Sequence, residues 1–242
     1  MKRWAEITPD PNSLQAKAFR LDTLRRAYAL PVVSRIPYLA KLAGGKRVLD
    51  VGVVEHTAVH ETKQDWLHRE IAKSAAYCLG VDVLEADIKI LQTTGYNVQV
   101  CDITREDPGD RFELIVIGEV IEHVGSPEEF FHAAKRLLVP GGRLVITTPN
   151  AYYWKQIRNQ IRRHKSRCES VDHVTLLFPS GMAEMAERSG LVLDTYRGVF
   201  THEGRPPVAG AALAIRHLVG STLAASELFC ETIIYECVNV VK

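Results

Sequence analysis

A short apolar run that ends in glycine, followed thirty positions later by an aspartate, constrains the fold of this chain most strongly. The run 47–51 is rich in β-branched residues and too short for a helix, so we expect a buried strand that turns sharply at Gly52. A second apolar run, 77–81, ends at Asp82. An acidic residue that closes the second strand of a β-α-β unit is well placed to accept hydrogen bonds from a ribose. The two runs predict a nucleoside-containing cofactor at the carboxyl ends of these strands.

The chain continues as alternating strands and helices. We expect further strands over 97–101, 112–117, 143–148, 191–196 and 231–240, and helices around 65–75, 84–93 and 126–138. Ser126-Pro-Glu-Glu129 resembles a capping box at the start of the last of these helices, and Pro140-Gly-Gly142 is expected to end it. This alternation predicts an α/β fold, a Rossmann-like, doubly wound, mostly parallel sheet with helices on both faces.

The remaining segments surround this predicted sheet. Residues 1–45 contain helical patterns over 14–30 and 31–43, and we expect them to form an N-terminal helical cap on a main domain of residues 46–242. We expect substrate-side insertions at about 151–180 and 200–226, with helices over 151–163, 182–189 and 211–218.

Length and composition narrow the class of protein. A chain of 242 residues with 46% hydrophobic and 24% charged residues favours one globular domain with a cap or insertion over two independent domains. A net charge of +1 argues against a nucleic-acid partner. The first residues lack the apolar segment of a signal peptide, and no apolar run reaches membrane-spanning length. Five cysteines without C-x-x-C spacing favour reduced thiols over a disulfide framework or zinc site, so we expect a cytoplasmic protein.

Several motifs in a fixed order point to a family. They are Val48-Leu-Asp-Val-Gly52, Gly80-Val-Asp82, Cys101-Asp-Ile103, Phe112-Glu-Leu-Ile-Val-Ile-Gly-Glu-Val-Ile-Glu-His-Val124, Pro140-Gly-Gly-Arg-Leu-Val-Ile-Thr-Thr-Pro-Asn150 and Asp172-His173. Over about residues 46–196 the chain resembles the class I S-adenosylmethionine-dependent methyltransferases. It is most similar to the branch of O-methyltransferases of quinone biosynthesis and of glycan and natural-product gene clusters. The resemblance implies a seven-stranded sheet with an antiparallel last strand, and S-adenosyl-L-methionine as cofactor.

One motif departs from the family pattern. The family usually carries Gly-x-Gly-x-Gly after the first strand, whereas this chain has Gly52-Val-Val-Glu-His-Thr-Ala58 and about ten additional residues before Asp82. Val53 and Val54 cannot adopt a positive φ cheaply, so this loop must follow another path. Either Glu55 and His56 supply polar contacts that backbone amides usually give, or the cofactor site is damaged. We favour the altered but working site because Asp82, Asp102 and Glu119 remain in place.

The resemblance assigns the cofactor contacts. Asp82, with Val83 beside it, would bind the ribose hydroxyls, and Asp102 and the backbone amide of Ile103 would bind adenine. By the same resemblance we expect Asp50 and Gly52 near the methionine end of the cofactor, and the position of Glu119 at the end of the fourth predicted strand is expected to make it face the cofactor cleft. The alternative for each acid is an ordinary turn residue or helix cap.

Two histidines are candidates for catalysis. Glu119 and His123 are four residues apart and could share a face, which would give a carboxylate-oriented imidazole for general-base work on a hydroxyl. His173 follows Asp172 near the expected substrate mouth, where it could act as a base or contact the acceptor. The alternatives are that His123 has only a structural packing role and that His173 tethers the insertion to the sheet. His56, His60 and His68 lack a nearby cysteine pair or acidic cluster, so we expect no metal site.

The function that follows is methyl transfer from S-adenosylmethionine to a small-molecule hydroxyl, such as a sugar, glycan precursor or natural product. An amine acceptor and a quinone precursor are alternatives, as is a non-catalytic protein that kept the fold. A dehydrogenase would require Gly-x-Gly-x-x-Gly, which the chain lacks. The basic, aromatic segment 152–167 could bind a phosphate on the acceptor, contact an anionic membrane, or be a solvated face. The sequence does not indicate an oligomeric state.

Overall fold

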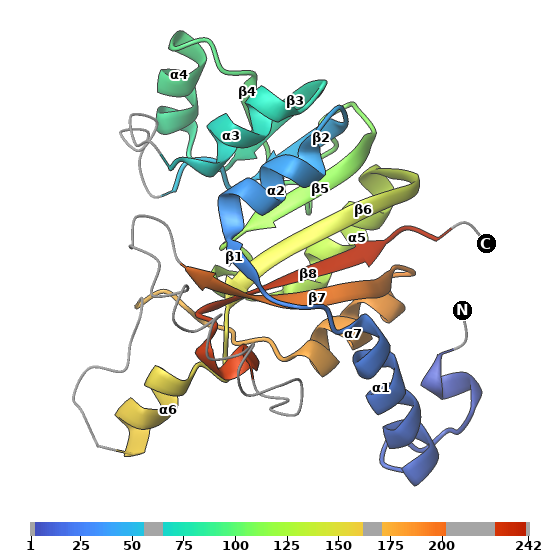
Figure 1. The fold of residues 1–242 in the computed structure, drawn as a ribbon. Helices are drawn as coiled ribbons and strands as arrows, with labels where there is room; N and C mark the ends of the chain where they lie inside the picture. The colour runs from blue at the N-terminus through green and yellow to red at the C-terminus, as the bar shows by residue number, and fades with distance from the viewer. Residues whose placement is uncertain (1–2, 56–64, 162–170, 202–225, 241–242) are drawn as a thin grey trace.

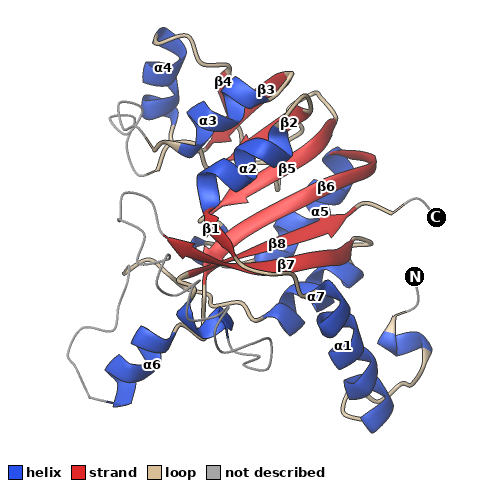
Figure 2. Cartoon of the chain, in the orientation of Figure 1, coloured by secondary structure: helices blue, strands red, loops and turns tan. Residues whose placement is uncertain are grey.

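A computed structural model of the chain describes residues 3–55, 65–161, 171–201 and 226–240 (Figure 1). These residues form one twisted sheet with helices on both faces (Figure 2). The prediction of a Rossmann-like α/β fold is therefore confirmed.

The sheet of the described residues has eight strands in the order β1-β7-β8-β6-β5-β2-β3-β4. Their bounds are β1 Val32–Ser34, β2 Arg47–Val51, β3 Tyr77–Asp82, β4 Val98–Val100, β5 Phe112–Gly118, β6 Leu138–Pro149, β7 Val192–Thr201 and β8 Thr232–Val238. The last strand, β8, is antiparallel to both β6 and β7, as predicted. The seven predicted strands correspond to β2–β8, and β1 adds a further strand at the edge by pairing in parallel with β7. Three residues after a proline are too few to give a strand periodicity.

Helices cover both faces of the sheet. Their bounds are α1 Leu14–Ala27, α2 Arg35–Ala43, α3 Leu67–Ser74, α4 Glu85–Thr93, α5 Pro127–Leu137, α6 Trp154–Ile161 and α7 Pro179–Arg188, with short 3-10 turns at Trp4–Glu6, Ile121–His123 and Ser226–Phe229. Apolar residues of α2 and α3 pack on one face of the central strands. The other face is covered by α5 and α7 together with the end of α1. Figure 1 shows α2 and α3 in front of the sheet and α5 behind it.

Two local predictions on α5 were wrong. The helix begins with Pro127 as expected, but the Ser126 side chain makes no capping hydrogen bond. The backbone carbonyl of Ser126 accepts a 3.2 Å hydrogen bond from the Glu129 amide instead. Residues 140–142 do not terminate α5, which ends at Leu137, but lie inside β6. There the Gly141 amide donates a hydrogen bond to the backbone carbonyl of Asn239, which links this glycine turn to the residue that follows β8.

The N-terminal residues take part in the sheet. Within the predicted cap, β1 extends the sheet and α2 buries Leu39 and Ala43 against the strands. The division of the chain at residue 45 stays a prediction, and so do the two insertions. The predicted helix over 211–218 lies outside the described residues.

Two global features complete the fold. In the part of the chain that the structure describes, no helix is long and apolar enough to cross a membrane. Four cysteines in that part carry free thiols, namely Cys78, Cys101, Cys230 and Cys237.

Candidate functional site

The candidate site lies where β2 sits between β3 and β5 at the carboxyl ends of the parallel strands. The chain runs outward from β2 to β3 and β4 and then crosses back to β5 on the other side of β2, and open α/β sheets bind ligands where the strand order reverses in this way. A cavity of about 480 Å³ opens there. It is lined by Val51, Gly52, Val81, Asp82, Val83, Cys101, Asp102, Ile103, Thr104, Arg105, Val120, Val124, Gly125, Ser126, Glu129 and Phe130.

The loop after β2 takes the different path that its sequence requires. Gly52 has a φ of +83°, and a Cβ there would lie 2.2 Å from Val120 Cγ2. The next positive φ falls on Glu55, at 41°, so neither valine adopts one. Val53 and Val54 are instead buried, at 2% and 1% exposure. The predicted polar contribution of Glu55 to the cofactor stays a prediction, and His56 lies outside the described residues.

Asp82 lies at the cavity with both carboxylate oxygens engaged by the backbone. Oδ2 accepts a 3.0 Å hydrogen bond from the Val54 amide, and Oδ1 accepts a 3.1 Å bond from the Leu84 amide. A carboxylate has about four lone-pair positions, so each oxygen can accept a further hydroxyl. Val83, the neighbouring lining residue, is 63% exposed.

Asp102 and Ile103 line the same cavity after β4. Asp102 Oδ1 accepts hydrogen bonds from the Thr104 amide at 3.0 Å and the Thr104 hydroxyl at 2.6 Å. These contacts are the ones expected if Asp102 is an ordinary turn residue. The other carboxylate oxygen, Oδ2, lies 3.5 Å from Arg105 Nε. Ile103 is 1% exposed and packs into the main core.

Asp50 pairs with a histidine beneath the site. Its Oδ2 atom lies 2.9 Å from His68 Nδ1, and both residues are buried. Asp50 is not among the residues that line the cavity. A Cβ at Gly80 would lie 2.6 Å from His68 Cε1, so this glycine makes room for the imidazole. The other two histidines of the considered metal set, His56 and His60, lie outside the described residues.

Glu119 ends β5 in a left-handed conformation, with a φ of 56°. Its carboxylate lies 3.3 Å from Arg35 Nη1, and the same nitrogen donates a 3.1 Å hydrogen bond to Thr147 Oγ1. Sequence analysis missed Arg35, because a buried arginine at the start of α2 has no local signature. Glu119 therefore contacts Arg35 and not His123, the partner that the sequence predicted. The predicted pairing needed an α-helix to place both residues on one face, whereas the chain after Glu119 forms a 3-10 turn.

Glu122 is a buried acid on that turn. Its side chain is 1% exposed, and Oε2 accepts a 3.0 Å hydrogen bond from the Thr148 hydroxyl. Burial, and then the negative charge of Glu119, raise the pKa of Glu122 to about 8. Its Oε1 atom has no hydrogen-bond partner among the described residues.

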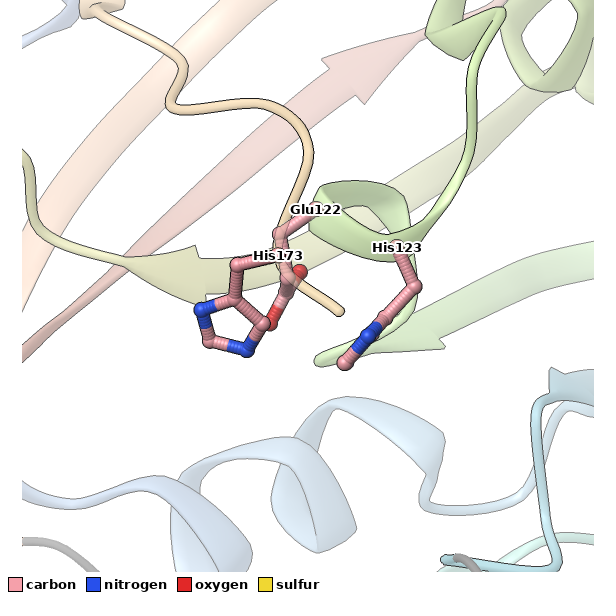
Figure 3. Close-up of side chains that lie close together, drawn as sticks. All are labelled: Glu122, His123 and His173. Carbon is pink, nitrogen blue, oxygen red and sulfur yellow. The ribbon is translucent and has the colours of Figure 1, made fainter. Parts of the chain in front are cut away.

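His123 is paired with Asp172, a residue that sequence analysis did not connect to it. Asp172 Oδ2 lies 2.9 Å from His123 Nδ1, and the His173 ring packs edge-on against the His123 ring at 4.7 Å. The amides of Val174 and Thr175 both donate to the Glu122 carbonyl, which holds the segment before α7 against the turn. Figure 3 shows His173 reaching the turn that carries Glu122 and His123.

These three side chains also meet a geometric condition for a cation. Glu122, His123 and His173 each offer a ligand atom, and these atoms lie within 4.8 Å of one another. The absence of a metal stays a prediction.

Comparisons with known proteins agree with this geometry. Residues 22–196 match a family described as a methyltransferase domain. The ubiquinone biosynthesis O-methyltransferase of Coxiella burnetii (strain Dugway 5J108-111) is 28% identical over 170 residues, 65% of this chain and 68% of that protein. The protein of the same name from Aeromonas salmonicida (strain A449) is 24% identical over 180 residues, 68% of this chain and 72% of that protein.

Two solved structures share the fold. The magnesium protoporphyrin IX methyltransferase of Synechocystis PCC 6803, with bound SAH, has a TM-score of 0.54 at 13% identity. That match covers 84% of this chain and 79% of that one. An S-adenosylmethionine-dependent methyltransferase from Mesorhizobium loti has a TM-score of 0.53 at 17% identity, covering 84% of this chain and 96% of that one.

The fold is that of a Rossmann-like α/β protein whose cavity is bordered by acidic residues at the end of β3 and after β4. The family match spans well over half of the 242 residues, and the chain belongs to the methyltransferase-domain family. Its methyl donor is S-adenosylmethionine. The residues present fit this cofactor, because the cavity is large enough for a small ligand and the Asp82 oxygens retain acceptor capacity.

Proposed function

We propose that this protein transfers a methyl group from S-adenosylmethionine to a hydroxyl of a small molecule. The observation that carries the proposal is the His123–Asp172 pair, 2.9 Å apart and beside the His173 ring. A carboxylate that orients an imidazole is a suitable arrangement for removing a hydroxyl proton. In this proposal His123 is the base, Asp172 orients it, and His173 contacts the acceptor.

The chain's own residues have limited chemistry to perform. The bound cofactor supplies a methyl group that its sulfonium already activates for displacement. In this proposal the Asp172 carboxylate, whose Oδ2 lies 2.9 Å from His123 Nδ1, orients the imidazole, and Nε2 is the atom that takes the acceptor proton as the oxygen–carbon bond forms. We assign the ribose contact to Asp82 with Val83, and the adenine contact to Asp102 and the Ile103 amide. Glu119 is assigned to the cofactor cleft.

The two sequence relatives, from Coxiella burnetii and Aeromonas salmonicida, support a hydroxyl acceptor, because both are named as O-methyltransferases. Among the residues that the structure describes, the charge of Lys155 and Arg158 supports a phosphate on the acceptor or contact with a membrane. Both cations lie over aromatic rings, at 5.4 Å from Tyr153 and 4.8 Å from Trp154. A cytoplasmic setting without a nucleic-acid partner belongs to the same proposal.

The test is methyl transfer from labelled S-adenosylmethionine to a panel of phenols, sugars and primary amines. We expect a hydroxyl compound to be methylated, and Asp172→Asn to lower kcat by about 10²-fold with the KM for S-adenosylmethionine unchanged. His132→Gln changes an exposed histidine on α5 and serves as the matched control. Circular dichroism of each variant checks the fold.

The outcomes separate the alternatives. Transfer to amines alone would replace the proposal by N-methylation. A folded protein that binds neither the cofactor nor SAH would be a non-catalytic member of the family. Transfer to a hydroxyl with full activity in Asp172→Asn would preserve the reaction and remove His123 from the role of base.

A further inference from the structure

One peptide unit in the loop after β2 is held at both of its ends. The carbonyl oxygen of Val53 accepts a 2.9 Å hydrogen bond from the indole Nε1 of Trp66. The amide of Val54, which belongs to the same peptide plane, donates a 3.0 Å hydrogen bond to Asp82 Oδ2. A continuous chain of hydrogen bonds therefore runs from the indole through this peptide to the carboxylate.

The surroundings make the indole a fixed donor. Trp66 is 1% exposed, and its ring packs edge-on against Tyr96 at 4.8 Å. Val53, Val54 and Trp66 form one buried apolar cluster with Ile88, Leu91 and Val98 of α4 and β4. Because the indole position is fixed by this packing, the orientation of the 53–54 peptide is fixed as well.

We propose that Trp66 is a positioning residue for cofactor binding, acting on Asp82 through the 53–54 peptide. The inference rests on the proposal that Asp82 receives the ribose hydroxyls. A hydrogen bond to the carbonyl end of a peptide strengthens its N–H as a donor, so the indole reinforces the bond to Asp82. The Leu84 amide holds the other carboxylate oxygen, and the two bonds fix the rotation of the side chain.

This arrangement does the work that a glycine-rich turn does by bringing its backbone close to the ligand. Gly52 is the one glycine in residues 52–55, and the two valines after it are directed into the core. The amides of Gly52 and Val53 donate to the Val81 carbonyl, and the Trp66 indole adds a side-chain donor that sets the next peptide plane. Trp66, the residue that supplies this donor, lies 13 residues beyond Val53 in the chain.

The first test needs no ligand. Trp66→Phe keeps an aromatic ring against Tyr96 and removes the indole N–H. We expect hydrogen exchange at the Val54 amide, followed by NMR in the ligand-free protein, to become at least about tenfold faster. The matched control is Trp4→Phe, which removes an indole that donates to Glu184 at 2.8 Å in another part of the molecule. An unprotected Val54 amide in the wild type, or unchanged exchange in Trp66→Phe, overturns the proposal.

The second test is a double-mutant cycle on SAH binding, measured by calorimetry. Trp66→Phe is expected to weaken binding by about five- to tenfold in the wild type and by less than about twofold in an Asp82→Ala background. Equal losses in both backgrounds would mean that Trp66 acts on stability or cavity shape and not through Asp82. That outcome also overturns the proposal.

The two tests distinguish a failure of this proposal from a failure of the methyl-transfer proposal. If the wild type binds SAH but methylates no hydroxyl, the cycle still decides the role of Trp66. If Asp82→Ala binds SAH as tightly as the wild type, Asp82 has no ribose role and the inference about Trp66 falls with it.

Discussion

At the residue scale, Glu122 combines burial with an unusual protonation state. Its carboxyl is 1% exposed, accepts a 3.0 Å hydrogen bond from the Thr148 hydroxyl, and has a pKa raised from 4.5 to about 8. In the folded protein this side chain therefore keeps its proton at neutral pH, whereas the unfolded chain has lost it. A protonated carboxyl is a hydrogen-bond donor, so near neutral pH Glu122 is able to donate a hydrogen bond.

This difference predicts the sign of a pH effect on stability. Between pH 4.5 and about 8 the folded state binds more protons at Glu122 than the unfolded state does, so the free energy of unfolding falls as the pH rises. We expect a loss on the order of a few kcal/mol across this window. Glu122→Gln should remove this part of the slope. Urea unfolding of both proteins at several pH values gives the difference curve, and a flat difference curve would contradict the raised pKa.

At the element scale, α2 is the helix whose role the sequence described least well. Its pattern predicts part of a cap, yet Ile36, Leu39 and Ala43 pack against strands in the middle of the sheet. Its first residue, Arg35, reaches Glu119 at the end of β5. The helix therefore contributes both to the core and to the candidate site.

The difference between α2 and α1 can be measured with one substitution in each. Leu39 is 0% exposed, so Leu39→Ala should lower the free energy of unfolding by about 2–5 kcal/mol through lost burial and a cavity. Leu14 on α1 is 86% exposed, so Leu14→Ala should stay within about 0.5 kcal/mol. Chemical denaturation checks both values. A small effect at Leu39 would mean that α2 is only loosely attached to the sheet.

At the scale of the whole molecule, the beginning of the chain is fastened to its later part. Arg20 of α1 pairs with Glu184 at 2.7 Å and Glu187 at 2.8 Å, both on α7. The Ala29 amide donates to the Tyr196 carbonyl just before β1 joins β7. These contacts join segments more than 160 residues apart into one body.

Arg20 provides the test of this attachment. Its side chain is 15% exposed, so Arg20→Met removes the paired cation from the partly buried Glu187 and one of two cations from Glu184, and it should cost about 1–2 kcal/mol. Arg188 also pairs with Glu184 but is 54% exposed, and Arg188→Met should cost less than about 1 kcal/mol. Shifts of the urea midpoint measure both. Equal shifts would show that the α1–α7 pairing adds nothing beyond a surface ion pair.

The sequence by itself determined the order of the main strands and helices, and it located Asp82, Asp102 and the loop that avoids a positive φ at its valines. These features depend on periodicity, chain termination and backbone sterics, which act over a few neighbouring residues. The family followed from the same short motifs, because most of them mark the end of a strand, although Asp172-His173 lies in the loop before α7.

Only the tertiary structure decided which side chains meet. Arg35 and Thr147 are 112 residues apart, and Asp172 reaches His123 across the whole of α5 and β6. The three-residue strand β1 exists because the edge of β7 offers it hydrogen-bond partners. Trp66 is bound to the loop through a single indole N–H. Such contacts depend on the packing of distant elements, which leaves no period or local spacing in the chain.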